Sequence, residues 1–246
     1  MRMKQYLIAI ALLTVSAGMM AQSKAGTWAL LPKVGVTIAN ITNNDLRIAD
    51  TDGILKSKSQ AGYQVGLDVQ YQCADNLALS LGAFYASLGN RYDDYELLVQ
   101  APGEDKQALY DNYTDFHTTL QYVQVPLMAH LYAAPGLAIK AGIQMGVLTH
   151  AATEYDVRGF KQDTETGVRI YNETSTAYKD TSKDGYKKMD ISIPLGLSYE
   201  YMNVVVDARY NWGLTKIHNL TDSKNSFFTF TVGYKFELLP TARFSQ

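Results

Sequence analysis

The sequence predicts an all-β protein, an eight-stranded antiparallel up-and-down β-barrel that spans a membrane. The first observation is a hairpin over residues 61–87, where the odd-numbered residues of each arm are mainly apolar and alternate with glycine and polar residues. Such alternation places one set of side chains on each face of a strand. Each arm sustains it for about ten residues, the length a tilted strand needs to cross a bilayer. Tyr63 and Tyr71 bracket the first apolar row, as in the aromatic girdles of outer-membrane barrels.

The second observation is the order of the connections. Alternation marks eight segments, at residues 28–40, 62–72, 77–86, 119–132, 137–147, 188–201, 204–213 and 227–236. Short turns follow every second segment, whereas the polar stretches 41–59, 89–118, 149–187 and 215–225 follow the others. Outer-membrane barrels have short periplasmic turns and long extracellular loops. For the hairpin alone, the alternative is a soluble sandwich or a lipocalin-like barrel, but such a fold has no reason to alternate short and long connections. We therefore expect four extracellular loops.

Two prolines interrupt the expected strands, Pro126 in residues 119–132 and Pro194 in residues 188–201. Proline removes a hydrogen-bond donor from the ladder and normally lies at an edge or a bulge. We expect a bulge at Pro126, and Pro194 raises the same problem.

The N-terminus predicts export. Residues 1–21 have a basic start, an apolar run and then small residues, which is the pattern of a secretory signal peptide. Cleavage after Ala21 and cleavage as late as Ala25 both remain open. We expect the barrel over residues 26–237, a C-terminal extension over residues 238–246, and a location in the bacterial outer membrane. No later apolar stretch is long enough for a membrane helix, so a mature chain that spans a membrane must close into a barrel.

Composition argues against several classes of function. The formal charge of −2 over 246 residues is unlike that of a nucleic-acid-binding protein. The single cysteine, Cys73, cannot form an internal disulfide, and the four histidines stand singly, without zinc spacing. His117 follows Asp115 closely, but no serine or second acid is specifically placed beside this pair. We expect no enzyme activity, no metal and no cofactor.

The polar rows become the interior of the predicted barrel. Eight strands enclose a space that side chains can fill, and buried charges are tolerated when they are paired. We therefore expect a lumen charge network that plugs the barrel near its periplasmic side, whereas a gated ion path or proton relay is the alternative. The network residues carry four charges of each sign: Lys33, Asp68, Lys140, Asp190, Glu200, Asp207, Arg209 and Lys235.

The expected second loop, residues 89–118, is acidic and interleaved with tyrosines. Carboxylates bind hard cations through oxygen, but no calcium-loop spacing is present and an acidic surface loop is usually only solvated. The weak candidates for binding are Asp93, Asp94, Glu96, Asp111 and Asp115.

Several motifs resemble one family. The segment Tyr122-Val-Gln-Val-Pro-Leu is similar to the Tyr-Leu-Glu-Ile-Pro-Leu strand of the PorT-like outer-membrane β-barrel proteins of Bacteroidetes. Lys33 with Gly35, Leu195-Gly-Leu-Ser-Tyr-Glu, Asp207-Ala-Arg-Tyr and Gly233-Tyr-Lys-Phe resemble its other signatures, over nearly all of the mature chain. The resemblance implies a porin-like eight-stranded barrel of a Gram-negative bacterium, in a family with one branch in protein secretion and gliding. Gln124 departs from the family's usual glutamate.

These observations together predict a small outer-membrane barrel with a plugged lumen and long extracellular loops for surface binding or adhesion. The alternatives are a narrow porin-like channel for small solutes and a structural component of a protein-secretion system. The expected partners are outer-membrane lipid and, beyond it, envelope or secretion proteins, and we expect a monomer.

Overall fold

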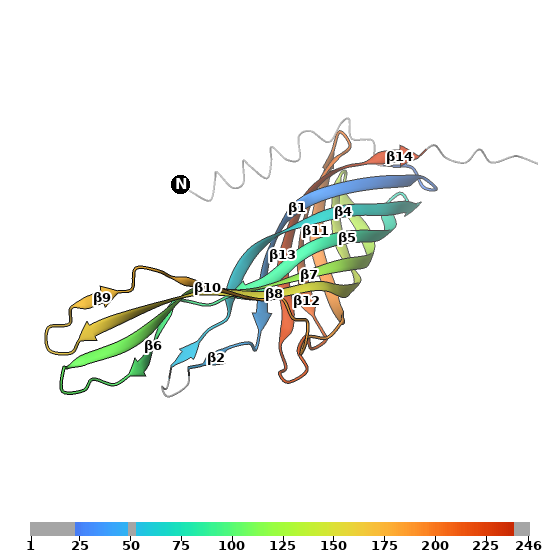
Figure 1. Ribbon diagram of the computed structural model, residues 1–246. Coiled ribbons are helices and arrows are strands. Elements are labelled where there is room, and N and C mark those ends of the chain that lie inside the picture. The colour runs from blue at the N-terminus through green and yellow to red at the C-terminus, as the bar shows by residue number, and fades with distance from the viewer. Residues whose placement is uncertain (1–22, 49–52, 239–246) are drawn as a thin grey trace, which may run out of the picture.

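The computed structural model describes residues 23–48 and 53–238. It shows an antiparallel β-barrel and a narrower sheet that protrudes from one end of it (Figure 1). The predicted signal peptide, residues 1–21, lies outside the described residues, as does all of the predicted C-terminal extension except Leu238. Among the described residues, no helix is long and apolar enough to cross a membrane.

Eight strands form a closed ring, which confirms the predicted barrel. Their order around the ring is β1 (Trp28–Thr42), β4 (Lys58–Ala74), β5 (Leu77–Arg91), β7 (Gln107–Ala134), β8 (Leu137–Asp163), β11 (Met189–Tyr201), β12 (Val204–Gly213) and β13 (Lys224–Tyr234). All neighbours are antiparallel, and the ring closes where β13 pairs with β1. The short β14 (Phe236–Leu238) continues the pairing with β1 beyond β13.

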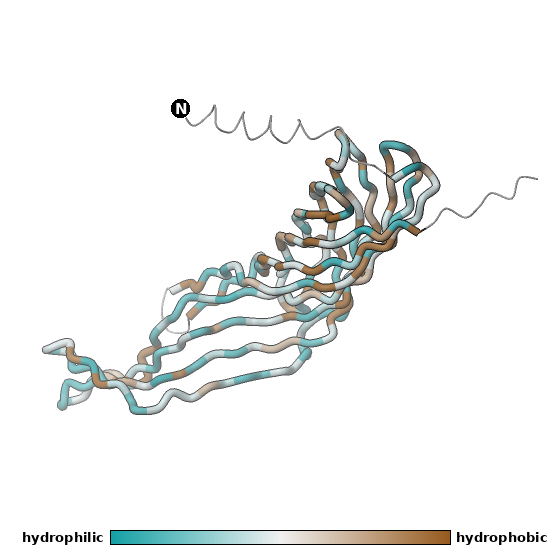
Figure 2. The backbone as a smooth tube through the Cα atoms, turned by 90° about the horizontal axis from the view of Figure 1, so that it is seen from above, coloured by the Kyte–Doolittle hydropathy of each residue, from teal (hydrophilic) through white to brown (hydrophobic). Residues whose placement is uncertain are grey.

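Each wall strand separates an outer apolar row from an inner, mainly polar row. On β1, Val34, Val36 and Ile38 are exposed, whereas Lys33 and Thr37 are buried. A large exposed apolar surface is the outer face that lipid covers in a membrane barrel. The ring pairs Tyr63–Tyr85 and Trp28–Tyr71 lie toward opposite ends of this surface. Figure 2 shows hydrophobic residues along the barrel strands and a mainly hydrophilic protruding part.

Two of the expected loops are largely β-sheet. β7 and β8 are 28 and 27 residues long and stay paired as far as Gln107 and Asp163, well beyond the barrel. The strands β6 (Tyr95–Gln100), β9 (Arg169–Tyr171) and β10 (Thr176–Asp180) pair along them. The prediction of loops over residues 89–118 and 149–187 was therefore wrong. Water covers both faces of this sheet, so its strands lack the one-sided apolar alternation that marks the wall. In the described part of the first expected loop, between β1 and β4, the short strands β2 (Leu46–Arg47) and β3 (Ile54–Leu55) pair with each other.

The predicted bulge at Pro126 is also wrong. The pairing of β7 with β5 and with β8 keeps one register on both sides of Pro126, and β11 does the same at Pro194. A Cβ added to Gly82 on β5 would come within 3.0 Å of the Pro126 ring, so a glycine leaves room for it. The β7–β8 pairing instead shifts register between Thr114 and His117 and between Gln121 and Tyr122, where the wall passes into the protruding sheet.

Candidate functional site

The middle of the barrel interior holds a cluster of buried charges around Asp207. The Asp207 carboxylate forms ion pairs with Lys140, with Lys33 at 3.6 Å, and with the Arg209 Nε at 2.8 Å. Lys33 also donates a hydrogen bond of 2.7 Å to Asp68. These five side chains are almost completely buried, and they carry three positive and two negative charges. We call these five residues the Asp207 cluster.

The other three predicted network residues lie apart from this cluster. The Lys235 ammonium donates to both carboxylate oxygens of Glu200, at 2.9 and 3.1 Å, near the short-turn end of the barrel. Asp190 lies toward the opposite end, where its carboxylate accepts hydrogen bonds of 2.9 Å from the Thr215 hydroxyl and the Asn225 amide. The structure thus divides the eight predicted residues into three groups.

An apolar layer, absent from the sequence-based expectation, crosses the interior at the extracellular end. It consists of Ala39, Ile41, Leu88, Leu120, Tyr122, Leu148, Ala151, Ile217 and Phe227, with Tyr186 packed against it. Ile217 and Tyr186 come from the segments that connect strands, so these segments fold into the mouth of the barrel. The sequence does carry a signal for this layer, because large apolar residues such as Leu88 and Leu120 stand on the inward row near the ends of the predicted strands.

A second, smaller apolar group of Ala29, Leu31 and Val205 lies toward the short-turn end. Between this group and the Asp207 cluster is a cavity of about 10 Å³, lined by side chains that include Lys33, His130 and Glu200. Such a volume is close to the least that one water molecule occupies.

The protruding sheet carries a row of stacked aromatic rings. Tyr95 and Tyr113 are parallel to within 2° at 4.7 Å, Tyr113 lies 5.9 Å from Tyr155, and Tyr155 stacks on Tyr178 at 5.2 Å. We call these four residues, one from each of β6, β7, β8 and β10, the tyrosine ladder. Burial and the nearby Asp111 carboxylate raise the pKa of Tyr113 above its ordinary value.

The ladder continues the lumen face of the wall. Thr118 and Thr153 are opposite each other, with their hydroxyl oxygens 3.3 Å apart. Thr118 is two residues from Leu120, and Thr153 is two residues from Ala151; Leu120 and Ala151 both belong to the apolar layer. Tyr155 follows two residues after Thr153. Residues two apart on a strand share a face, so the tyrosine ladder lies above the mouth of the barrel.

The opposite face of the sheet is built around Phe160, which is fully buried. Tyr110 stacks on it at 5.1 Å, and the Arg169 guanidinium lies 4.9 Å from its ring centre. Arg169 also forms an ion pair of 2.7 Å with Glu96 on β6. The sheet is therefore held on both faces by rings and cations rather than by an enclosed apolar core.

The predicted acidic candidates do not form one site. Asp93 pairs with Lys58 at 2.6 Å, Glu96 pairs with Arg169, and Asp111 lies beside Tyr113. Asp94 accepts a hydrogen bond of 3.3 Å from the Asp115 amide, and Asp115 lies beside His117. In the part of the chain that the structure describes, no three metal-ligating side chains gather as they would around an ion.

Each side of the protruding sheet ends in an edge strand, which is paired along one edge and free along the other. β6 and β10 are the terminal strands of the hydrogen-bonded order. Leu98 and Val99 of β6 are 55% and 60% exposed, and all five residues of β10 are exposed. An edge strand presents free backbone N–H and C=O groups to any chain that can pair with it.

The fold and this exposed sheet define a class: a small outer-membrane β-barrel protein that carries β-structure beyond the membrane surface. The family described as outer membrane protein beta-barrel domain matches residues 20–219, and the chain belongs to this family. The protein is accordingly located in the bacterial outer membrane, where lipid surrounds its barrel. Small outer-membrane barrels of this kind are generally not enzymes.

Several solved structures are similar to this chain. Neisserial surface protein A has 14% sequence identity and a TM-score of 0.44, with 85% of this chain and 99% of that chain covered. The attachment invasion locus protein Ail of Yersinia pestis has 12% identity and a TM-score of 0.39, with 86% and 99% covered. The N-terminal barrel domain of OprF from Pseudomonas aeruginosa has 11% identity and a TM-score of 0.30, with 87% and 100% covered. Among curated proteins, none matches this sequence.

Proposed function

We propose that this protein is a non-enzymatic surface-binding protein, in which a plugged barrel anchors a β-sheet that pairs with an extended segment of another protein. The observation that carries this proposal is the protruding sheet, whose faces are braced by rings and whose edge strand β6 exposes Leu98 and Val99. Addition of a strand to such an edge gains main-chain hydrogen bonds, and the exposed side chains contribute specificity. The barrel itself serves as the membrane anchor.

Substitution at the edge tests the binding function. The full mature protein is reconstituted in lipid vesicles, and vesicle retention is measured on a surface coated with mixed extracellular-matrix protein. Val99→Pro blocks strand addition at β6 because proline adds bulk and lacks the N–H group, so retention should fall severalfold. Glu104→Pro, at the second position of an exposed turn outside the strands, where proline is favoured, is the matched control. Equal retention of the wild-type protein and Val99→Pro would refute binding through the β6 edge.

The plugged lumen is the second part of the proposal. Its support is the succession of the apolar layer, the Asp207 cluster and the small apolar group along the interior. In planar bilayers we expect no single-channel steps from the wild-type protein. The double variant Tyr122→Ala, Ile217→Ala removes two large side chains of the apolar layer. Single-channel steps from this variant would reveal a path for ions through the lumen that the layer blocks. Reproducible steps from the wild-type protein would instead favour the narrow porin-like channel.

The PorT-like affiliation within Bacteroidetes belongs to the same proposal and rests on the sequence motifs alone. It brings a further candidate role, as a structural component of a secretion system. A stable complex with export proteins, copurified from outer membranes, would favour that role over adhesion.

A further inference from the structure

A pocket of about 260 Å³ lies on the protruding sheet, beyond the tyrosine ladder. Its lining includes Val99, Leu109, Asp111, Gly159, Lys161 and Asn172. Asp111 stands two residues before Tyr113 on β7, so the pocket is on the same face as the ladder. In the register of β7 with β8, Asp111 is directly opposite Gly159. Leu109 is likewise opposite Lys161, and these four residues therefore share that face.

Two polar groups converge above Gly159, at the floor of the pocket. A Cβ added to this glycine would lie 2.7 Å from the Asn172 Nδ2 and 3.5 Å from the Asp111 Oδ1. Glycine thus keeps the floor open at the point where an amide donor and a carboxylate acceptor meet. Lys161 adds an ammonium group, which only donates. In the described part of the protruding sheet, neither Asp111 nor Lys161 takes part in an ion pair, so both can bind a ligand.

The backbone holds these groups in place. The Asn172 N–H donates a hydrogen bond of 2.9 Å to the Gly159 carbonyl, and the Asn172 carbonyl accepts one of 2.8 Å from the Arg158 Nε. Asp111 stands on the central strand β7, where it is paired with Leu97 on one side and Gly159 on the other. A site whose backbone is already fixed loses less conformational freedom when a ligand binds.

The chemistry of the pocket favours a neutral ligand that carries several hydroxyl groups. Asp111 repels an anion, Lys161 repels a cation, and a single carboxylate supplies too few ligands for a metal ion. A hydroxyl group can both donate to a carboxylate and accept from an amide or an ammonium group. Neighbouring hydroxyls on one ring can therefore satisfy all three polar side chains. The volume lies just below the roughly 300–1,000 Å³ of pockets for drug-sized ligands, which suits a single ring.

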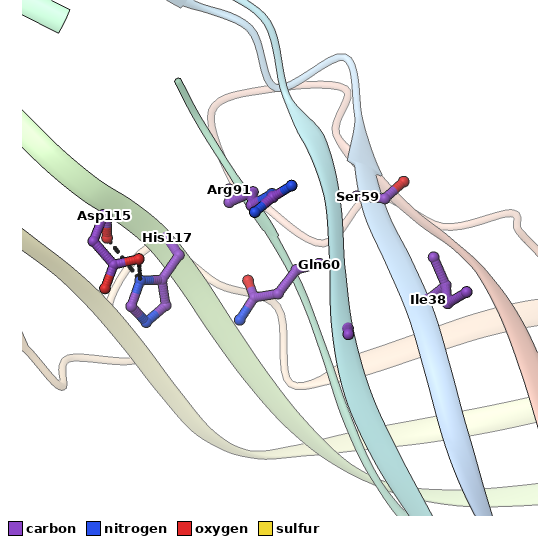
Figure 3. A pocket seen from close by; sticks show the side chains of 7 residues that line it. Ile38, Ser59, Gln60, Arg91, Asp115 and His117 are labelled. Atoms are coloured by element: carbon purple, nitrogen blue, oxygen red, sulfur yellow. Dashed lines mark hydrogen bonds and ion pairs between the residues drawn. The ribbon is translucent and has the colours of Figure 1, made fainter. Parts of the chain in front are cut away.

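A larger pocket of about 450 Å³, where the barrel meets the sheet, lacks this convergence (Figure 3). Its carboxylate, on Asp115, lies 3.5 Å from the ring nitrogen of His117 on the same strand, rather than beside a group across the pocket. Arg91 points away from that pair. The smaller pocket over Gly159 is therefore the better-built site.

We propose that the pocket over Gly159 binds one neutral hexose ring. Adjacent hydroxyls of the ring donate to the Asp111 carboxylate, and their oxygens accept hydrogen bonds from the Asn172 amide and the Lys161 ammonium. A C–H face of the ring packs against the apolar side chain of Leu109. This site uses side chains on the face of the sheet, whereas the proposed strand addition uses main-chain groups at the β6 edge. Either function can therefore fail without the other.

The test uses the full mature protein in phospholipid nanodiscs, prepared with a detergent that contains no sugar. The probes are methyl β-D-galactopyranoside, methyl β-D-glucopyranoside and methyl α-D-mannopyranoside, which differ in the arrangement of their hydroxyls. Saturation-transfer difference NMR measures contact with each ring, and titration gives the Kd. We expect saturation transfer from the wild-type protein to at least one of the three glycosides. The fully O-methylated form of that glycoside, which has no hydroxyl donor for Asp111, should receive none.

Two variants test the assigned contacts. Asp111→Asn exchanges a carboxylate acceptor for an amide, and Gly159→Ala places a methyl group where it displaces the Asn172 amide. Each should raise the Kd about tenfold, the effect of one lost hydrogen bond. Asp156→Asn, on the opposite face of β8, is the control for the first variant. Gly103→Ala, where the added Cβ meets only an ordinary contact of 3.5 Å, is the control for the second.

Absence of saturation transfer from the wild-type protein to all three glycosides would overturn the proposal. An unchanged Kd in either pocket variant would do the same, as would an O-methylated glycoside that binds as tightly as its parent. Gly159→Ala should fold normally, because Gly159 lies within a strand and the Asn172 amide is the movable end of a flexible side chain. Matching far-ultraviolet circular dichroism of all variants guards against misfolding as the cause of a loss.

Discussion

The barrel wall and the protruding sheet share two strands, β7 and β8, and yet they are stabilised in different ways. Inside the wall, these strands have lipid on one face and the lumen on the other. Beyond the wall, the same strands have water on both faces, and stacked rings and ion pairs hold them to β6, β9 and β10. The length of β7 and β8 thus follows from backbone pairing with their neighbours. The residue types on each face follow from whether lipid, the lumen or water lies against that face. Substitutions in the two regions should therefore differ sharply in cost.

The largest effect is expected at Asp207. Asp207→Ala leaves Lys33, Lys140 and Arg209 buried with only Asp68 to balance them. Loss of one partner from a buried ionic group costs about 3–5 kcal/mol. Guanidinium unfolding of the protein in lipid vesicles should show a loss of this order. Asp222→Ala, at a surface ion pair with Lys216, is the control and should change little. Similar unfolding curves for both variants would mean that the cluster is not a stabilising feature.

The second-largest effect is expected when a leucine is replaced by arginine on the outer face of the wall rather than on the protruding sheet. Leu67→Arg places a charge on the lipid-facing row of β4, which costs about 2–4 kcal/mol at the bilayer midplane. Leu98→Arg, on the exposed edge of β6, meets water instead and should cost almost nothing. Unfolding free energies in the same vesicles measure both. A cost at Leu98 equal to that at Leu67 would contradict the division into lipid-covered and water-covered regions.

This difference also explains how much could be predicted from the sequence. The wall was predictable because lipid and lumen demand opposite polarity, so Val34, Val36 and Ile38 alternate visibly with Lys33, Gly35 and Thr37. The protruding sheet was not predictable by that signal, since water lies on both of its faces. Tyr95, Tyr113, Tyr155 and Tyr178 meet only across four strands, and nothing in their spacing reveals it.

The lumen shows the same limit. The inward charges could be named from strand parity, but which of them meet depends on the stagger of strands around the ring. Lys33 on β1 reaches Asp68 on β4 and Asp207 on β12. Asp190 on β11 instead accepts hydrogen bonds from two neutral groups, on Thr215 and Asn225. Ile217 could not be placed in the interior at all, because it stands outside the periodic segments.

A smaller, local effect is expected in the tyrosine ladder. Tyr113→Ala removes the central contacts with Tyr95 and Tyr155, and aromatic pairs of this kind contribute about 0.5–1.5 kcal/mol each. Hydrogen exchange should become faster in β6 and β10 while the barrel strands keep their protection. Tyr201→Ala, near the short-turn end, should leave exchange in the protruding sheet unchanged. If Tyr113→Ala lowers protection in the barrel equally, the two regions unfold as one unit and the contrast between them fails.

The smallest effect is a pH dependence confined to the sheet. Lys179 on β10 contacts Glu154 on β8 at 2.7 Å, and its hydrogen bond holds the pKa of the Glu154 carboxyl below its ordinary value. A lowered folded-state pKa means that this contact stabilises the sheet above the ordinary carboxyl range and is lost as the pH falls through the lowered value. Both side chains are well exposed, so the contribution is small. Exchange in β10, expressed as the ratio of wild-type to Glu154→Gln protection, cancels the intrinsic pH dependence of exchange. This ratio should exceed one at pH 7 and approach one in acid. A ratio that stays constant with pH would mean that Lys179 does not hold β10 to β8 through the Glu154 carboxylate.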